Sequence, residues 1–393
     1  MKIKLKYLIS SPFIAISALI FLWYIPYLYP SYFFPFEKVY GFWGHTLFCL
    51  VLLSIVIFSR ILSGHPSLKL ERFEAKDIVV PKVTKTWFTI SKVFIYTATL
   101  MNILIATNAY LTYDGNIHAS KASLADFGGI NILSQFYLFF IVPYLLYTFQ
   151  NKLKWNKVFV VLLGLILLTR SIYLAERLAI LEFVLPIILV LVTLKNKRVL
   201  VTKFLKYFAF LLLFFVLLEL SRQFSDQYGD KNMDVWFKLQ WTLERFFNYY
   251  GDTQNKFYYV FENGLSFETT NYLEWAGRVI RRITGIEIET GHNIDFGKYH
   301  WRDYTNFGGL SYTYTDFGIV LGVTFLITFF TLFFRIWFKL KTGSLYAWSV
   351  YPMFFLWVAE FPRYNGIFLN RFIIAFILFN FTYLIFRNVK IFK

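Results

Sequence analysis

The sequence has a single cysteine, Cys49, and few charged residues for its length. One cysteine excludes a disulfide framework and a site built from several thiolates. Charged residues make up only 16% of the 393 residues, whereas soluble domains carry about 25%. Histidine is also scarce. The five histidines stand apart along the chain, which argues against a zinc site: positions 45, 65, 118, 292 and 300.

Several signatures of soluble enzymes are absent as well. The chain contains no G-x-x-x-x-G-K-[ST] phosphate loop, no G-x-S-x-G and no H-E-x-x-H. The first connection predicted to lie outside, YPSYFFPFEKVYG, offers only Glu37, without the paired acids of a divalent-metal site. We find no internal repeat and no low-complexity segment. We therefore expect no metal and no cofactor.

Long apolar runs are what the sequence does contain. Hydrophobic residues make up 58% of the chain, and several runs approach the ~20 residues that cross a bilayer core as helix. This composition predicts an all-α, polytopic membrane protein with one transmembrane domain over residues 1–393. The basic N-terminus resembles a signal peptide, but its apolar run is too long and no cleavage site follows, so we expect a retained first helix. The ten expected spans are 7–29, 41–62, 93–113, 129–149, 158–173, 178–194, 199–220, 316–337, 344–360 and 367–386.

The basic residues cluster in alternate connections. Six segments hold 24 of the 40 Lys and Arg residues but only three acids, a net charge of +21, and the rest of the chain carries −4. These segments are 2–6, 60–92, 152–157, 195–206, 335–341 and 387–393. The positive-inside rule then predicts that both termini are cytoplasmic. The basic pI reflects this topology and anionic lipid, so we expect no nucleic-acid partner.

The stretch LILLTRSIYLAERLAILEFVLPIILV (165–190) places Arg170, Glu176, Arg177 and Glu182 inside an apolar run. The 37 residues from 158 to 194 would form a helix about 55 Å long, far more than a bilayer needs. Basic clusters on both sides also require the chain to return to one face. We therefore predict a hairpin of two short spans with its tip, residues 169–177, at the outer surface. Arg170 and Arg177 would share a helix face only if the helix continued through this tip.

Charges near the other spans also map to their outer ends. Each one alone is compatible with a snorkelling or interfacial side chain, but a one-sided set favours an outward-facing polar cavity. The set is Asp114, Glu219, Arg222, Asp316, Glu360, Arg363 and Arg371. Asp316 could instead be the N-cap of the eighth span.

The long connection at 221–308 is predicted to lie outside. Within it, DVWFKLQWTLERFFNYYGD (234–252) predicts an interfacial amphipathic helix with Val235, Leu239, Leu243 and Phe246 on its apolar face. A second helix, NYLEWAGRVIRRITG (271–285), crowds three arginines on one side. That face either lies in water or binds an anionic ligand such as phosphate. His300, Arg302, Asp303 and Asn306 follow near the mouth of the predicted cavity.

The chain resembles the bacterial O-antigen and capsule polymerases, which join oligosaccharide repeat units. The resemblance covers nearly the whole chain and includes the span pattern, the basic inner face and the long outer loop. It also includes three local patterns: LLTRS (167–171), RFFNYYGDTQNKFYYVFENGLSF (245–267) and TNFGGLSYTYTDFGIVLGV (305–323).

The resemblance implies a metal-independent glycosyltransferase of the glycosyltransferase-C type in the bacterial inner membrane. Its partners would be undecaprenyl-diphosphate-linked oligosaccharide, membrane lipid and a chain-length regulator protein. Arginines of the outer loops matter in that family, which assigns the diphosphate to Arg170, Arg177, Arg245, Arg278, Arg281 and Arg282. The charges at the cavity mouth add Arg302 and Arg363.

The expected reaction is attack of an acceptor hydroxyl on the anomeric carbon of a diphosphate-linked glycan. Arginines would stabilise the departing diphosphate, and Asp316, His300 and Asn306 are the expected catalytic residues. Arg170→Ala and Arg278→Ala are each predicted to abolish polymer and to leave the protein folded. An O-antigen ligase, a lipid-linked oligosaccharide flippase or other transporter, and a structural scaffold remain alternatives.

Overall fold

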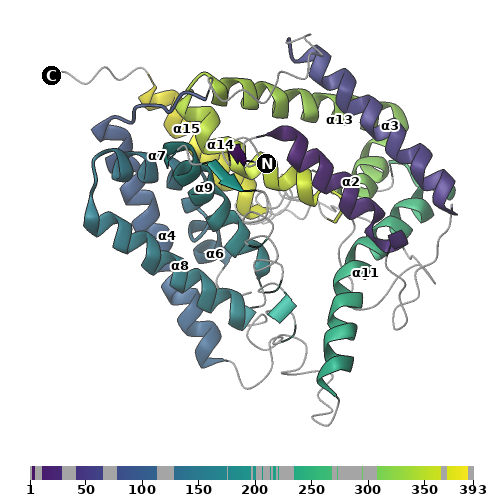
Figure 1. Cartoon of the computed structure of the whole chain (residues 1–393), viewed down its shortest axis with the longest axis horizontal. Helices are drawn as coiled ribbons and strands as arrows, with labels where there is room; N and C mark the ends of the chain where they lie inside the picture. The colour runs from purple at the N-terminus through teal and green to yellow at the C-terminus, as the bar shows by residue number, and fades with distance from the viewer. Residues whose placement is uncertain are drawn as a thin grey trace, which may run out of the picture.

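The structure, a computed structural model, is helical with one pair of short strands (Figure 1). It describes residues 2–4, 11–28, 41–64, 78–112, 128–174, 176–195, 198–200, 234–267, 308–363 and 370–387, together with the single positions 206, 213, 216, 217, 220, 272 and 294. Five helical segments are long and apolar enough to cross a membrane, judged by length and composition: Phe42–Leu62, Lys85–Leu111, Gly129–Gln150, Lys154–Leu174 and Gly309–Lys341.

The helices overlap most of the expected spans, but the expected span 129–149 is divided into two helices, and the expected span 93–113 begins eight residues earlier, at Lys85. The early ones are α2 (Pro12–Leu28), α3 (Gly41–Leu62), α4 (Lys85–Leu111), α6 (Gly128–Leu133), α7 (Tyr137–Gln150), α8 (Lys154–Leu174) and α9 (Arg177–Lys195). The later ones are α11 (Val235–Glu262), α13 (Gly309–Lys341), α14 (Leu345–Glu360) and α15 (Asn370–Phe386). The predicted hairpin is confirmed as two helices, α8 and α9. The expected span 199–220 lies largely outside the described residues.

The helix α7 forms the centre of the bundle. Its side chains from Tyr137 to Leu146 are buried, and it packs against α4, α9, α14 and α15. In the apolar segment that includes α7, 78% of the residues are buried, against 28% in α3. A helix that is apolar all round and covered on every side belongs in the interior.

Apolar side chains cover the outside of several peripheral helices. Leu47 of α3 is 64% exposed, Val161 of α8 is 63% exposed and Val320 of α13 is 77% exposed. Such continuous apolar surface is rare on soluble monomers. On helices of this length it is the surface that a bilayer would cover.

Three of the predicted inner segments meet at one end of the bundle. The Val79 N–H donates to the carbonyl of Lys341 (2.9 Å), and Gln150 Nε2 donates to the carbonyl of Pro81 (2.9 Å). These contacts join segments 60–92 and 335–341 and bring Gln150, two residues before segment 152–157, beside them. The charge pattern places all three segments on one face. The end of α14 lies away from this end, because α14 begins at Leu345, close to Lys341, and runs to Glu360. The start of α13 meets the end of α14 there, since the Gly309 N–H donates to the Phe361 carbonyl.

One pair of three-residue strands accompanies the helices of the all-α fold. β1 (Lys2–Lys4) pairs antiparallel with β2 (Arg198–Leu200), with Ile3 opposite Val199. The first helix begins only at Pro12, since proline suits the first helical position. Lys2–Lys4 and Arg198–Leu200, which are parts of two further basic segments, are thereby brought side by side.

The helix α13 is broken near its start, which corrects the expected span 316–337. Gly318 has non-helical angles (φ 64°, ψ −163°), so residues 309–317 form a separate half-helix. A side chain at Gly322 would meet the Thr313 methyl at 3.2 Å, although nine residues separate the two positions. In a straight helix they would be about 13 Å apart along the axis. The chain therefore turns sharply at Gly318.

Candidate functional site

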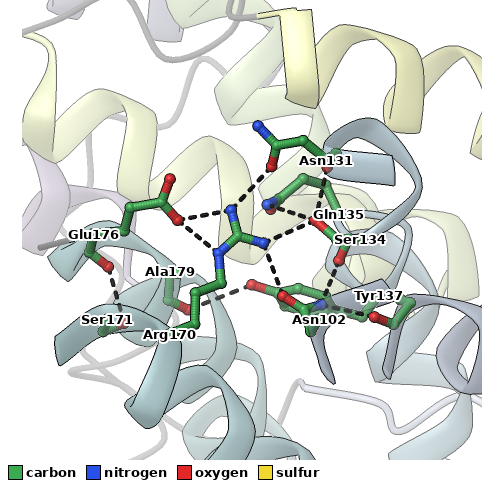
Figure 2. Close-up of polar contacts among 10 residues, drawn as sticks. Asn102, Asn131, Ser134, Gln135, Tyr137, Arg170, Ser171, Glu176 and Ala179 are labelled. Carbon is green, nitrogen blue, oxygen red and sulfur yellow. Dashed lines mark hydrogen bonds and ion pairs between the residues drawn. The ribbon is translucent and has the colours of Figure 1, made fainter. Parts of the chain in front are cut away.

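Arg170 lies at the centre of a buried hydrogen-bonded cluster (Figure 2). Its Nε and one terminal nitrogen contact Glu176 Oε2, both at 2.7 Å. The other terminal nitrogen donates to Asn102 Oδ1 and Ser134 Oγ, both at 2.8 Å. Asn131 Oδ1 accepts the remaining bond at 3.0 Å. Since a guanidinium has five N–H donors, this cluster occupies all of them.

The Arg170 cluster joins three parts of the fold. Asn102 comes from α4 and Asn131 from α6, while Glu176 lies between α8 and α9. Asn102 also donates to the carbonyls of Ala98 and Ser134, both at 2.8 Å. Arg170 can bind a phosphate only if some of these contacts are given up. In this conformation the residue holds the tip of the α8–α9 hairpin against α4 and α6.

Arg177 is the first residue of α9, whereas Arg170 lies on α8. Helix α8 ends at Leu174 and α9 begins at Arg177, so the helix does not continue through the tip. The condition under which Arg170 and Arg177 would share a helix face is therefore not met. The side chain of Arg177 lies outside the described residues.

A second group of buried polar residues lies on α11, which runs on the opposite side of the molecule from α8 (Figure 1). At the start of the predicted apolar face, Val235 is 76% exposed, as an apolar side chain of an interfacial helix would be. From Thr242 onward the helix turns polar side chains inward as it packs against α2 and α13. The buried polar residues are Thr242, Glu244, Arg245, Asn248, Asp252, Thr253, Gln254, Asn255 and Lys256.

An ion pair occupies the C-terminal end of this α11 polar segment. Lys256 Nζ lies 2.6 Å from Asp252 Oδ2, one helical turn away, and the two side chains are 2% and 1% exposed. Burial lowers the pKa of Lys256, and the Asp252 carboxylate opposes that shift. A buried pair of this kind is weak support for stability and is often kept for another reason.

The neighbouring amides are only partly paired. Gln254 Nε2 donates to the carbonyl of Trp23 on α2. Among the described residues, neither Gln254 Oε1 nor Asn255 Oδ1 has a hydrogen-bond partner, although both atoms are buried. Buried acceptors without partners are costly and uncommon, and each calls for an explanation.

The α11 polar segment meets the start of α13 and the end of α14. A side chain at Gly308 would meet the Pro362 carbonyl oxygen at 2.9 Å and Thr253 Cβ at 3.2 Å. The Gly309 N–H donates to the Phe361 carbonyl (2.9 Å). Gly308 also has a positive φ of 76°. The two glycines thus permit a close approach that other residues would prevent; we call this meeting point the α11–α13–α14 junction.

Of the predicted diphosphate ligands, Arg363 adjoins this junction, and Arg245 lies on α11 eight residues before Thr253. Arg363 directly follows Pro362, and its terminal nitrogen is 3.6 Å from Glu360 Oε2. Arg245 lies on the same helix as Asp252, with its guanidinium 5.3 Å from the centre of the Trp241 ring. The structure thus associates Arg245 and Arg363 with the α11 polar segment, and it places Arg170 in a different cluster.

A buried histidine that the sequence analysis left unassigned borders the α11 polar segment. His45 of α3 has its Nδ1 2.6 Å from the Tyr258 hydroxyl, and its ring stacks on Trp23 at 5.7 Å. His45 Nε2 has no hydrogen-bond partner among the described residues. The contact between His45 and Tyr258 could not be predicted from sequence spacing, because 213 residues separate the two positions.

Asp316 lies beside the break in α13. Its Oδ2 accepts the N–H of Tyr272 (2.7 Å), and the Tyr272 hydroxyl is 2.7 Å from Thr313 Oγ1. The carboxylate thus holds a residue of the long loop against the half-helix. Burial raises the pKa of Tyr272 far above its usual value. Its hydroxyl therefore stays protonated.

The other predicted site residues lie outside the described residues. They are His300 and Asn306 among the catalytic candidates, and Arg278, Arg281, Arg282 and Arg302 among the diphosphate ligands. Within the described part of the chain, no group of three or more His, Cys, Asp or Glu side chains could hold a metal ion.

No protein-family model, curated protein or solved structure matches this chain. The function must therefore be argued from the residues themselves.

Proposed function

We propose that this chain polymerises oligosaccharide units carried on a polyprenyl diphosphate, as a glycosyltransferase at the outer side of a bacterial inner membrane. The observation that carries the proposal is the α11 polar segment. A largely apolar bundle keeps nine polar side chains buried along one helix, including the Asp252–Lys256 pair. Ionisable groups inside such bundles usually mark the place where a polar substrate or ion is handled.

The position of this segment supports an outer site. It meets the start of α13 and the end of α14, which lie away from the end where three basic segments gather. By the positive-inside rule the basic end is cytoplasmic, as are both termini. Lipid-linked units would then reach the site from the outer leaflet, and a chain-length regulator protein would act from the same side.

The proposed reaction forms one glycosidic bond and releases one diphosphate. A hydroxyl oxygen of the acceptor unit bonds to the anomeric carbon of the donor, whose bond to the diphosphate oxygen breaks. The leaving oxygen keeps the electron pair, and the acceptor proton passes to a carboxylate or imidazole. Arg245 and Arg363 are the described residues that we assign to stabilising the negative charge.

The direct test uses purified protein and a synthetic polyprenyl-diphosphate repeat unit in lipid nanodiscs. The proposal predicts a ladder of lengthening glycans and release of polyprenyl diphosphate in a fixed ratio to the bonds formed. Transfer to lipid A core, without a ladder, would instead identify a ligase. A preparation that binds the repeat unit and yields neither product contradicts the proposed activity.

One observation favours a flippase as the second candidate. Interrupted helices such as α13, broken at Gly318, often line transporter binding sites. A flippase must expose its site to both faces in turn. Thr253 and Gln254 are buried in this conformation. If the chain is a polymerase, single cysteines at these positions, in a Cys49→Ser background, should show reaction with impermeant thiol reagents only when the reagent is added at the outer face, and reaction from both faces would favour the flippase.

A further inference from the structure

The first turn of α13 has hydrogen-bond donors that the described protein leaves unused. The first N–H groups of a helix have no partner within it. Gly309 gives its N–H to the Phe361 carbonyl, and Tyr312 makes the first bond within the helix, to Gly308. No described residue accepts a hydrogen bond from the N–H of Leu310 or Ser311. Both residues are buried, at 5% and 1% exposure.

The Ser311 hydroxyl adds a third donor at the same place. Ser311 Oγ is buried and has no hydrogen-bond partner among the described residues. It lies 3.8 Å from the position that a Cβ would occupy on Gly308, and so it points to the beginning of the helix. Serines inside helices usually bond to the carbonyl four residues back. Ser349 of α14 does so, with its Oγ 3.0 Å from the Leu345 carbonyl.

The electrostatics at this turn favour an anion. Nearby charged side chains occur as opposite pairs, Asp252 with Lys256 and Glu360 with Arg363. These pairs largely cancel, whereas the start of a helix carries a partial positive charge that no described carboxylate contacts. Backbone N–H groups, a hydroxyl and a helix start form the usual donor set for phosphate.

We infer that the first turn of α13 binds one phosphate group, through the N–H groups of Leu310 and Ser311 and the Ser311 hydroxyl. The chemical class is a phosphate or diphosphate ester. The proposed function adds that this ester carries a polyprenyl chain and a glycan. The anion site itself does not depend on the proposed function. Arg363, which follows Pro362 at the same junction, would then contact the second phosphate of a diphosphate.

The proposed phosphate site explains why glycines occupy positions 308 and 309. A side chain at Gly308 would collide with the Pro362 carbonyl, and one at Gly309 would lie 2.6 Å from the Phe361 ring. The glycines bring the helix start close to α14 and to Thr253 of α11. The unpaired oxygens of Gln254 and Asn255 could accept hydroxyl groups of the attached sugar.

The test measures binding of inorganic diphosphate, and of farnesyl diphosphate as a short polyprenyl ester, to the full chain in zwitterionic nanodiscs. Ser311→Ala removes one neutral donor, and we expect about threefold to tenfold weaker binding of both ligands. Ser311→Asp places a carboxylate where the phosphate would lie and should reduce affinity more than tenfold. Ser349→Ala is the matched control, because its hydroxyl is satisfied inside its own helix.

Three results would overturn the assignment, provided that the variants melt within a few degrees of the wild type. One is unchanged diphosphate binding in both Ser311 variants, even if the wild type forms the glycan ladder. Another is the absence of diphosphate binding by the wild type. The third is saturation by phosphatidylglycerol that diphosphate does not displace, which would identify a phospholipid headgroup site. Conversely, diphosphate binding that depends on Ser311 in a protein that makes no ladder supports the anion site and rejects the polymerase.

Discussion

Two buried polar clusters differ in how far the protein satisfies their hydrogen-bonding groups. The Arg170 cluster uses all five guanidinium donors and draws its acceptors from three parts of the fold. The α11 polar segment and the first turn of α13 leave buried groups without described partners: Gln254 Oε1, Asn255 Oδ1 and Ser311 Oγ.

This difference separates two roles for polar residues in an apolar bundle. A fully satisfied hydrogen-bond network holds the helices that contribute to it in one arrangement. Removing one member leaves the others buried without partners, which costs free energy of folding. A partly satisfied group lowers stability unless another molecule completes it. We therefore assign the Arg170 cluster to architecture and the α11–α13–α14 junction to ligand binding.

The largest expected effect comes from breaking the satisfied cluster. Arg170→Met should destabilise the protein by about 3–5 kcal/mol, because Glu176 and the amides lose their donor inside the fold. Arg170→Lys should rescue little, since an ammonium has three donors in place of five. Unfolding in detergent, followed by circular dichroism, measures the change. Arg335→Met, at an exposed arginine, is the control and should be neutral.

This prediction replaces the one made from the sequence, in which Arg170→Ala leaves a folded protein without polymer. A variant at Arg170 that melts like the wild type and fails only in polymerisation would restore Arg170 to the diphosphate site. The fully satisfied Arg170 cluster would then bind ligand as well.

The buried ion pair of α11 should respond differently. Lys256→Met leaves Asp252 buried without its cation, and we expect a loss of about 3 kcal/mol. Adding Asp252→Asn should recover part of that stability, because a neutral amide is less costly to bury. Polymerisation should be reduced in the single and the double variant alike. Full recovery of activity along with stability would assign the pair to folding alone.

The glycine at the junction provides a smaller test. Gly308→Ala should cost about 1–3 kcal/mol, from the positive φ of 76° and from the contact with the Pro362 carbonyl. Gly129→Ala is the matched control, because no atom lies within 4 Å of its Cβ position. An alanine there should be neutral or slightly stabilising. Equal melting temperatures for the two variants would argue against a close junction.

The sequence was sufficient for the helices and insufficient for the clusters. Length and charge alternation predicted the α8–α9 hairpin, because a helix of 37 residues cannot fit one crossing. The same reasoning could not assign Arg170, whose partners Asn102, Asn131 and Ser134 lie 68, 39 and 36 residues away in the chain. Hydrophobic periodicity placed α11 at an interface. The polar residues after Thr242 are buried because neighbouring helices cover them. The hydrophobic periodicity of one helix gives no information about such tertiary packing.

The smallest expected effect is also the most specific to the comparison. Asn255→Leu removes a buried carbonyl oxygen that no described residue pairs with, and keeps a similar volume. We expect stability to stay within about 1 kcal/mol of the wild type or to rise, because no protein hydrogen bond to that oxygen is lost. Asn102→Leu is the counterpart in the Arg170 cluster and should cost about 1–3 kcal/mol, since it leaves Arg170 short of an acceptor. The predicted pattern is therefore a stable Asn255 variant with weak polymerisation, beside a destabilised Asn102 variant whose remaining folded fraction is active. Equal destabilisation by both substitutions would mean that Asn255 is as structural as Asn102. In that case the unpaired groups at the junction would no longer point to a ligand.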